Sequence, residues 1–407
     1  MAKLTVLDEL TTPVDPDDLL YVVHAPATTA SSMKVKASRF GGPPSTNGFR
    51  LTLAPLNPVY APQPATPAST DTTADTCTFT LPHGWESGTI VTVSATGGGL
   101  TAGTRYFLNK VSTTVVSFHT AVANAIAGTS KVDLTASITA QVIPSGISNS
   151  TLYLTPFNGA QIGLYNGAAW VQLTSAEVSL ALGTLTSDKN YDVFAYSNAG
   201  VLTLELLAWT SDTVRATAII RQDGVWCKTG ALTRRYIGTI RTDSTTTTID
   251  DEGGIASQVG GKRFVWNMDN RRAAPLNLID TTPSWNYITN TWRQSNGAAG
   301  NKCEIVQGLA EDAVYALVLS LSSPDSSSMS AAGIGIDSTT PKGLMSLTYY
   351  STSGPASSTT VALTRRMNAG YHYLAWLEIG NGSGSTIWYG SNNNTRTQSG
   401  MTGTVYC

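Results

Sequence analysis

Short apolar runs alternate with turn signals between residues 151 and 209. Asn158-Gly159 and Asn166-Gly167 separate apolar runs at 152–157, 161–165 and 168–173. An Asn-Gly pair between short apolar runs indicates a tight hairpin, because both central residues of the turn need positive φ. The pattern therefore predicts a three-stranded antiparallel meander in which each run pairs with the next.

A further hairpin is predicted directly after this meander. Residues 189–196 and 201–209 flank the turn Asn198-Ala199-Gly200. Alternation in the second run places three leucines on one face, as a half-buried strand requires: Leu202, Leu204 and Leu206. We expect residues 150–242 to form one β-meander domain.

Similar short runs fill the rest of the chain. β-branched or alternating segments predict a small β-module at 77–146, and clusters of Gly, Ser and Asn separate many short strands at 262–407. Amphipathic helices are nearly absent and no fixed-period repeat is visible, which favours a β-sandwich or jelly roll over a parallel β-helix. The predicted fold class is all-β, with several small antiparallel β-domains in series and a C-terminal sandwich.

The two N-terminal segments differ from these domains. Residues 1–40 hold a few short apolar runs, and a unit of this size buries little core alone. We expect it to fold against copies of itself or a docking protein. Residues 41–76 hold seven of the 18 prolines and predict an extended, semi-rigid linker. The acidic run Asp250-Asp251-Glu252 lacks the spacing of an EF-hand loop, so we expect a solvated connector at 243–261.

Composition narrows the class of protein. The 407 residues suffice for two to four domains, and a net charge of −2 argues against nucleic acid as a partner. Charged residues make up only 13%, which suits a neutral polar surface exposed outside the cell. No signal peptide and no run long enough to insert in a membrane is visible.

The four cysteines lie far apart in the sequence, and we expect them to be buried thiols, with a disulfide between two of them as the alternative: Cys77, Cys227, Cys303 and Cys407.

Catalytic motifs do not emerge from the chain. The four histidines lie outside any nucleophile, phosphate-loop or zinc motif, so we expect no enzyme, no cofactor and no metal site. Glycoside hydrolysis needs only two carboxylates and stays an alternative. Its C-terminal candidates, each of which also suits a strand face or loop, are Glu304, Glu311, Asp312 and Glu378.

Aromatic side chains on predicted strands are the candidates for receptor binding. If Tyr371 and Tyr373 lie on one face of their strand, His372 and Trp376 lie on the other, and one face must be core. Exposed aromatics among Asn and Ser can stack on sugar rings, although most aromatics fill cores. The candidate receptor-binding residues are Tyr371, Tyr373, Trp376, Trp388 and Tyr389.

Several segments resemble a module of bacteriophage virion proteins. The resemblance rests on Tyr-Leu-Thr-Pro-Phe-Asn-Gly at 153–159, Leu-Tyr-Asn-Gly at 164–167, and residues 185–194. It continues through 234–241 and 262–267. In that family the module occurs in tail-fibre or head-fibre chains and precedes a C-terminal β-domain. The N-terminal unit is similar to segments that attach such fibres to the particle.

The resemblance implies a structural protein of the virion, made in the host cytoplasm. It would be a tail or head fibre or spike, attached to another virion protein through residues 1–40. The C-terminal β-domain would bind a host-surface glycan or protein, and we expect a homotrimer. Two alternatives stay open: a capsid decoration or tail structural protein without a receptor role, and a polysaccharide depolymerase.

Overall fold

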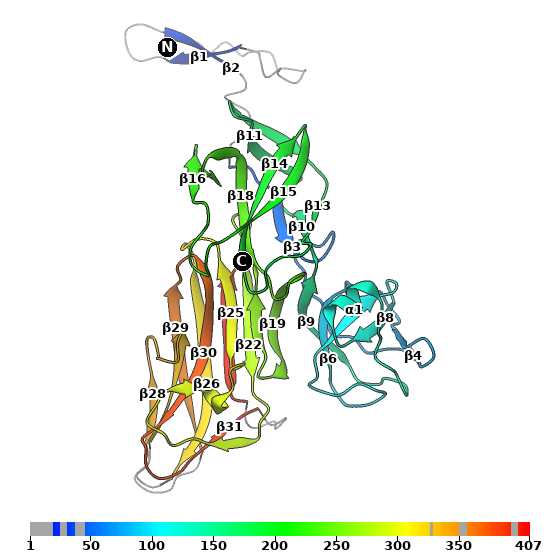
Figure 1. Cartoon of the computed structure of the whole chain (residues 1–407), viewed down its shortest axis with the longest axis vertical. Coiled ribbons are helices and arrows are strands. Elements are labelled where there is room, and N and C mark those ends of the chain that lie inside the picture. The colour runs from blue at the N-terminus through cyan, green and yellow to red at the C-terminus, as the bar shows by residue number, and fades with distance from the viewer. Residues whose placement is uncertain (1–18, 25–30, 37–44, 326–328, 350–355, 392–397) are drawn as a thin grey trace, which may run out of the picture.

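The computed structural model is almost entirely β, which confirms the predicted fold class. Strands take up 54% of the described residues and helices 3%. The structure describes residues 19–24, 31–36, 45–325, 329–349, 356–391 and 398–407. Figure 1 shows an upper group of strands stacked on a C-terminal sandwich, with a small module to one side. In the described residues, no helix is both long and apolar enough to span a bilayer.

A hairpin precedes this body. β1 (Leu19–His24) and β2 (Ser31–Lys36) pair antiparallel, with Leu19 opposite Lys36 and His24 opposite Ser31. The rest of the anchoring unit predicted at 1–40 lies outside the described residues. Whether this unit attaches the chain to a particle therefore stays a prediction.

The upper sheet is built around β14 (Asn190–Asn198) and β18 (Ala231–Arg241). Its other members are β15 (Val201–Ala208), β17 (Val225–Lys228), β16 (Ile219–Gln222) and β21 (Val265–Asn267). The predicted hairpin across Asn198-Ala199-Gly200 is confirmed, since β14 pairs with β15 through this turn. Leu202 and Leu204 are buried and Leu206 packs beside them, as the alternation predicted.

The meander predicted before this hairpin is only half right. β11 (Gln161–Tyr165) and β12 (Trp170–Thr174) pair across Asn166-Gly167 as expected. However, β10 (Thr151–Pro156) pairs with β13 (Val178–Ala181) and β3 (Phe49–Thr52), and not with β11. The N–H groups of Phe157 and Asn158 donate to Gly48 O instead of closing a hairpin.

β3 also corrects the expected linker. Phe49, Leu51, Leu53 and Ala54 are at most 2% exposed and belong to the core shared with β10 and β14. Residues 49–54 are therefore part of the folded body, and the prolines follow them. The linker prediction is wrong here because proline content reports local stiffness, whereas the burial of β3 comes from strands about 100 residues later.

The small module at 69–149 has its own core. Its strands are β4 (Ser69–Asp71), β5 (Thr76–Thr78), β6 (Thr89–Val93), β7 (Tyr106–Lys110), β8 (Val115–His119) and β9 (Val142–Asn149). The short helix α1 (Val122–Ala127) ends at Gly128, which has φ +67°. Phe79, Trp85 and Phe118 fill the interior. β9 leaves this module and pairs with β19 (Thr248–Ser257) of the main body.

Two sheets face each other in the C-terminal sandwich. The first holds β22 (Ala273–Ile279), β32 (Gly400–Tyr406), β26 (Ala313–Pro324), β29 (Ser357–Arg366), β31 (Thr386–Tyr389) and β23 (Ser284–Asn286). The second holds β20 (Gly260–Arg263), β25 (Lys302–Gln307), β30 (Gly370–Gly380), β27 (Met329–Ile336), β28 (Ser346–Tyr349) and β24 (Arg293–Gln294), with the 3-10 turn η2 (Ser295–Gly297). Their inner faces share one core.

β19 corrects the solvated connector expected at 243–261. It pairs with β20 on one sheet and β22 on the other, so it joins the two sheets at one edge. Asp251 is 1% exposed and binds Arg105 at 2.8 Å, while Asp250 binds Arg263 at 3.0 Å. Arg263 of β20 and Arg105, directly before β7, neutralise these acids, which explains how a polar run can form a buried strand.

The cysteines give a direct test of this packing. All four are buried free thiols, as expected. Burial raises the pKa of Cys303 to about 12 and that of Cys227 and Cys407 to about 11, and it also raises the pKa of Cys77. We expect a thiol reagent at pH 8 to label none of them in the folded protein and all four in denaturant. Rapid labelling of the folded chain would contradict this packing.

Candidate functional site

The aromatic residues predicted to bind a receptor do not form one surface. Trp376 is completely buried and Trp388 is 1% exposed, so neither can contact a receptor in this fold. Trp376 packs edge-on against Trp285, and Trp388 Nε1 donates to Tyr287 O at 3.1 Å. The expected alternation is nevertheless correct, because Tyr371 and Tyr373 are half-buried while His372 and Trp376 are buried. Tyr389 is half-buried on β31, opposite Leu321.

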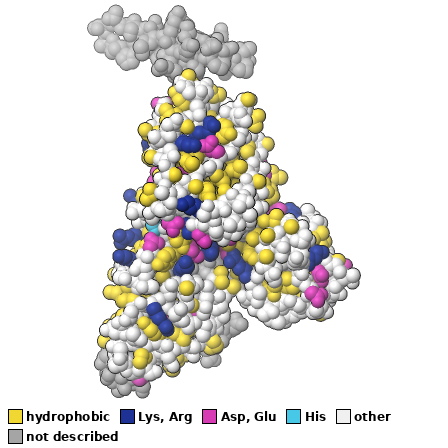
Figure 2. All heavy atoms as spheres, viewed as in Figure 1, with side chains coloured by type: hydrophobic (Ala, Val, Ile, Leu, Met, Phe, Trp, Pro, Cys, Tyr) yellow, Lys and Arg dark blue, Asp and Glu magenta, His cyan; other side chains and the backbone are white. Residues whose placement is uncertain are grey.

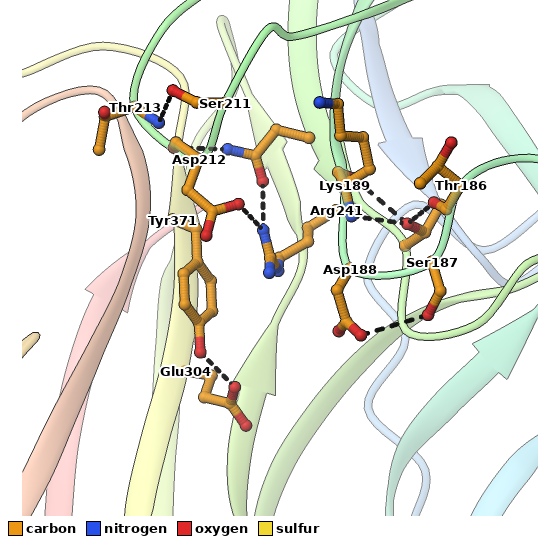
Figure 3. A network of polar contacts seen from close by, with 12 residues as sticks. Thr186, Ser187, Asp188, Lys189, Ser211, Asp212, Thr213, Arg241, Glu304 and Tyr371 are labelled. Carbon is orange, nitrogen blue, oxygen red and sulfur yellow. Dashed lines mark hydrogen bonds and ion pairs between the residues drawn. The ribbon is translucent and has the colours of Figure 1, made fainter.

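Tyr371 lies where the upper sheet meets the sandwich (Figure 3). Its hydroxyl donates to Glu304, its backbone N–H donates to Asp212 O at 2.9 Å, and the Arg241 guanidinium lies 3.8 Å from its ring centre. Burial, together with the Glu304 charge, raises the pKa of Tyr371 well above its ordinary value. This phenol is therefore a neutral structural donor, and Tyr371 serves the junction.

Arg241 extends this contact into the upper sheet. Its Nη1 donates to Asp212 Oδ1 at 2.7 Å and to Asn190 Oδ1 at 3.0 Å. Asn190 Nδ2 in turn donates to Asp212 O at 2.8 Å. At Gly370, a Cβ would come within 2.6 Å of Asp212 O, so glycine lets the 212–213 loop lie against the start of β30. We call this group the Arg241 clamp.

A second, half-buried cation joins the same two parts. Arg215 Nε binds Asp192 Oδ2 at 2.7 Å, and its Nη2 donates to Gly308 O at 2.6 Å, just beyond β25. Thr239 Oγ1 donates to the other oxygen of Asp192 at 2.8 Å. The guanidinium also lies 4.4 Å from the Trp209 ring centre. We call this group the Arg215 clamp; it links β14 and β18 to the sandwich.

The carboxylates considered for hydrolysis all have structural partners. Glu304 accepts from Tyr371 and binds Lys302 at 3.2 Å, and Arg271 binds both Glu311 and Asp312. Glu378 is completely buried, and burial raises its pKa to about 7. It nevertheless accepts hydrogen bonds from four residues of the 285–296 segment: Trp285, Arg293, Ser295 and Asn296.

Asp280 completes this buried network, and sequence reasoning did not select it. Asn296 donates its backbone N–H to Glu378 at 3.1 Å and its Nδ2 to Asp280 at 3.0 Å. Asn301 and Gln258 also donate to Asp280. The two carboxylates hold the 284–301 segment against β30. A raised pKa, as at Glu378, often marks a catalytic acid, whereas at Asp280 hydrogen bonds from Asn301 and Thr282 outweigh burial and lower the pKa. Both carboxylates are closed off from solvent, which favours a structural role.

A wide hollow lies on the outer face of the first sheet. It has a volume of about 420 Å³, and Leu317, Leu319, Ile279 and Ile255 line it together with Gly400, which leaves a dip between its neighbours. Three rows cross this face: Pro275–Thr404–Tyr315–Thr364, Asn277–Thr402–Leu317–Ala362 and Ile279–Gly400–Leu319–Thr360. None of these twelve positions holds an acidic or basic residue. We call these twelve positions the uncharged face; Glu252, from β19, also lines the hollow.

Charged side chains lie mainly outside the uncharged face. Figure 2 shows them concentrated where the upper sheet meets the sandwich and sparse over the sandwich below. In the described part of the chain, no three His, Cys, Asp or Glu side chains are grouped as a metal site would require. The surface therefore offers two kinds of binding feature: the uncharged face, and a smaller hollow lined by cations at the ends of β27 and β29.

Comparison with known proteins assigns no family. No family model matches the chain, and no curated protein does. Among solved structures, the insecticidal δ-endotoxin Cry8Ea1 of Bacillus thuringiensis matches at TM-score 0.19 and 6% identity, over 65% of this chain and 50% of the endotoxin. This chain thus spans about half the length of that toxin.

Two other solved structures are equally distant. The VP2 subviral particle of infectious bursal disease virus matches at TM-score 0.20 and 9% identity, over 88% of this chain and 79% of VP2. An exo-β-1,3-galactanase of Phanerochaete chrysosporium matches at TM-score 0.16 and 9% identity, over 74% and 78%. TM-scores this low do not indicate a shared fold.

The Arg215 clamp predicts a large loss of stability from one substitution. Arg215→Met should lower the free energy of unfolding by about 3 kcal/mol or more, because it leaves the Asp192 charge buried without its cation. Urea unfolding measures the change. Arg221→Met, which removes an exposed guanidinium from the same sheet, is the matched control and should change stability by less than about 1 kcal/mol. Equal effects of the two variants would contradict the role of the clamp.

Proposed function

We propose that this chain is a structural fibre or spike protein of a bacteriophage particle. Residues 1–40 would attach it to another virion protein, and the C-terminal sandwich would meet the host surface. The direction of the chain through the body supports this proposal. Ser45 O accepts from Arg235, which also donates to Gly163 of β11. β11 lies at the upper end of the body, and β28 and β31 lie at the lower end (Figure 1).

The two clamps are the observation that carries the proposal. A fibre must hold its contact domain at a fixed distance and angle from its attachment point. Here ion pairs and hydrogen bonds to backbone groups, and not a flexible linker, join the upper sheet to the sandwich. The candidate carboxylates are already occupied by cations or donors, which favours binding over hydrolysis.

Antibodies against the sandwich test the proposed host contact. We expect them to reduce adsorption of the phage to its host, because they cover the surface that would meet the cell. Antibodies against the small module, at the side of the body, are the control and should reduce adsorption less. Immunogold labelling spread evenly over the shell, with adsorption intact, would instead support the capsid-decoration alternative.

We propose further that copies of the chain associate through the uncharged face. Its composition suits an interface, since interface centres are depleted in charge and enriched in tyrosine. Tyr315 is 39% exposed and Leu319 37%, so large apolar groups stand in solvent in the isolated chain.

A charge placed on this face should separate the copies. We expect the full chain to sediment as a trimer at micromolar concentration and Leu319→Arg to sediment as a monomer, because the arginine would have to be buried without a partner. Leu81→Arg, at an exposed leucine of the small module, should behave as wild type. Analytical ultracentrifugation measures all three. A monomeric wild-type chain would refute the association.

A further inference from the structure

A polar hollow on the side of the sandwich is lined by several basic side chains. It has a volume of about 230 Å³ and lies where β27 and β29 end and β30 begins. The side chains that matter are Asp337, Lys342, Arg365, Arg366, Asn368 and His372. Figure 2 shows Lys and Arg atoms beside a histidine on the left flank, at the level where the upper sheet meets the sandwich.

The local fold brings these residues together. Arg365 and Arg366 are the last residues of β29 and follow the core position Leu363 after Thr364. The backbone N–H of Lys342 donates to Ile334 O at 2.8 Å, which folds the loop after β27 back against that strand. Two strand ends and one returning loop therefore place three cations around one hollow.

These cations lack acidic partners in the described part of the chain. Most buried or half-buried arginines of the protein bind a carboxylate, as Arg215, Arg241 and Arg293 do. Lys342, Arg365 and Arg366 are exposed, and no ion pair with any described Asp or Glu engages them. In a chain with only 13% charged residues, three unpaired cations at one hollow need an explanation.

The one acid that lines the hollow is already neutralised. Asp337 Oδ2 lies 2.7 Å from His372 Nδ1, and Asp337 Oδ1 accepts the backbone N–H of Tyr373 at 2.9 Å. His372 Nε2 faces Asn368 O at 3.0 Å, so both ring nitrogens face acceptors and both carry protons when both bonds form. Burial lowers the pKa of His372, but Asp337 outweighs burial and the net direction is upward. The His–Asp pair is then neutral, and the charge of the hollow is that of its three cations.

We propose that this hollow binds a phosphate, sulfate or carboxylate group carried by an acidic glycan. Arginine forks and a lysine ammonium are the protein groups that suit an oxyanion, through charge-assisted hydrogen bonds. The volume fits one such group with part of a sugar ring. A nucleic acid would instead need a long basic stripe, whereas the net charge here is −2 and the cations form one small group. This inference rests on the proposed contact with the host and names its chemistry.

Binding of dextran sulfate to the full chain tests the site. Titration calorimetry should show binding of dextran sulfate, no binding of uncharged dextran of the same length, and weaker binding at higher salt. The double variant Arg365→Gln/Arg366→Gln should bind dextran sulfate about tenfold more weakly or worse, because it loses two charge-assisted donors. The matched control is Arg221→Gln/Lys131→Gln, which removes two exposed cations elsewhere and should bind as wild type.

Three results would overturn the proposal. They are absence of binding by wild type, equal binding of charged and uncharged dextran, and equal weakening in the two double variants. Inorganic phosphate separates the possible sources of the anion: if it binds as tightly as dextran sulfate, the site takes a free ion and the glycan assignment is wrong. Circular dichroism checks that both variants fold, as their exposed positions predict.

Adsorption measurements separate this inference from the proposed function. Phage that carries Arg365→Gln/Arg366→Gln should adsorb more weakly than phage with the control variant. If adsorption is unchanged while dextran sulfate binding is lost, the hollow is refuted as the host contact and the fibre proposal stands. If antibodies to the sandwich leave adsorption intact while dextran sulfate still binds, the fibre proposal fails and the anion site stands.

Discussion

The rest of the structure depends on two arginines that lie between the upper sheet and the sandwich. Arg215 reaches from Asp192 to Gly308 O, and Arg241 reaches from Asp212 to the ring of Tyr371. Burying a charge is costly unless a carboxylate and further hydrogen bonds satisfy it. Because only one relative position of the two parts satisfies both cations, the clamps define the geometry as well as the stability of the joint.

Two of the three hairpins predicted from local patterns are correct, whereas the hairpin across Asn158-Gly159 and the distant pairings were not predicted correctly. The β14–β15 hairpin and the β11–β12 hairpin follow from a turn and a few alternating residues. β3 escaped notice because its partner β10 lies about 100 residues later and because it is buried on both faces, which removes alternation. β19 was not predicted for a different reason. Its acidic residues are typical of a solvated loop, and the arginines that pair with them, Arg105 and Arg263, come from distant parts of the sequence.

The same limit applies to function. Alternation correctly placed Tyr371 and Tyr373 opposite His372 and Trp376, but it could not tell which strand end faces a second domain. Tyr371 therefore belongs to a joint and not to a receptor surface. In the sequence, only the adjacent pair Arg365-Arg366 indicates the basic hollow. Lys342 and His372 are distant in sequence and come close to this pair only in the folded chain. What the two binding features share is position: both lie on the sandwich, which the clamps hold at a fixed orientation.

β19 has one more consequence, which concerns where the protein can be divided. This strand pairs with β9 of the small module, with β20 and with β22, so three parts of the chain are hydrogen-bonded to one strand. A fragment that starts at residue 262 would omit it and leave the remaining edges with unsatisfied backbone groups, ready to join another chain. The sandwich is thus not an excisable unit at that boundary. Sequence insertions that lengthen β19 or shift its register would disturb the strand pairing of all three parts at once.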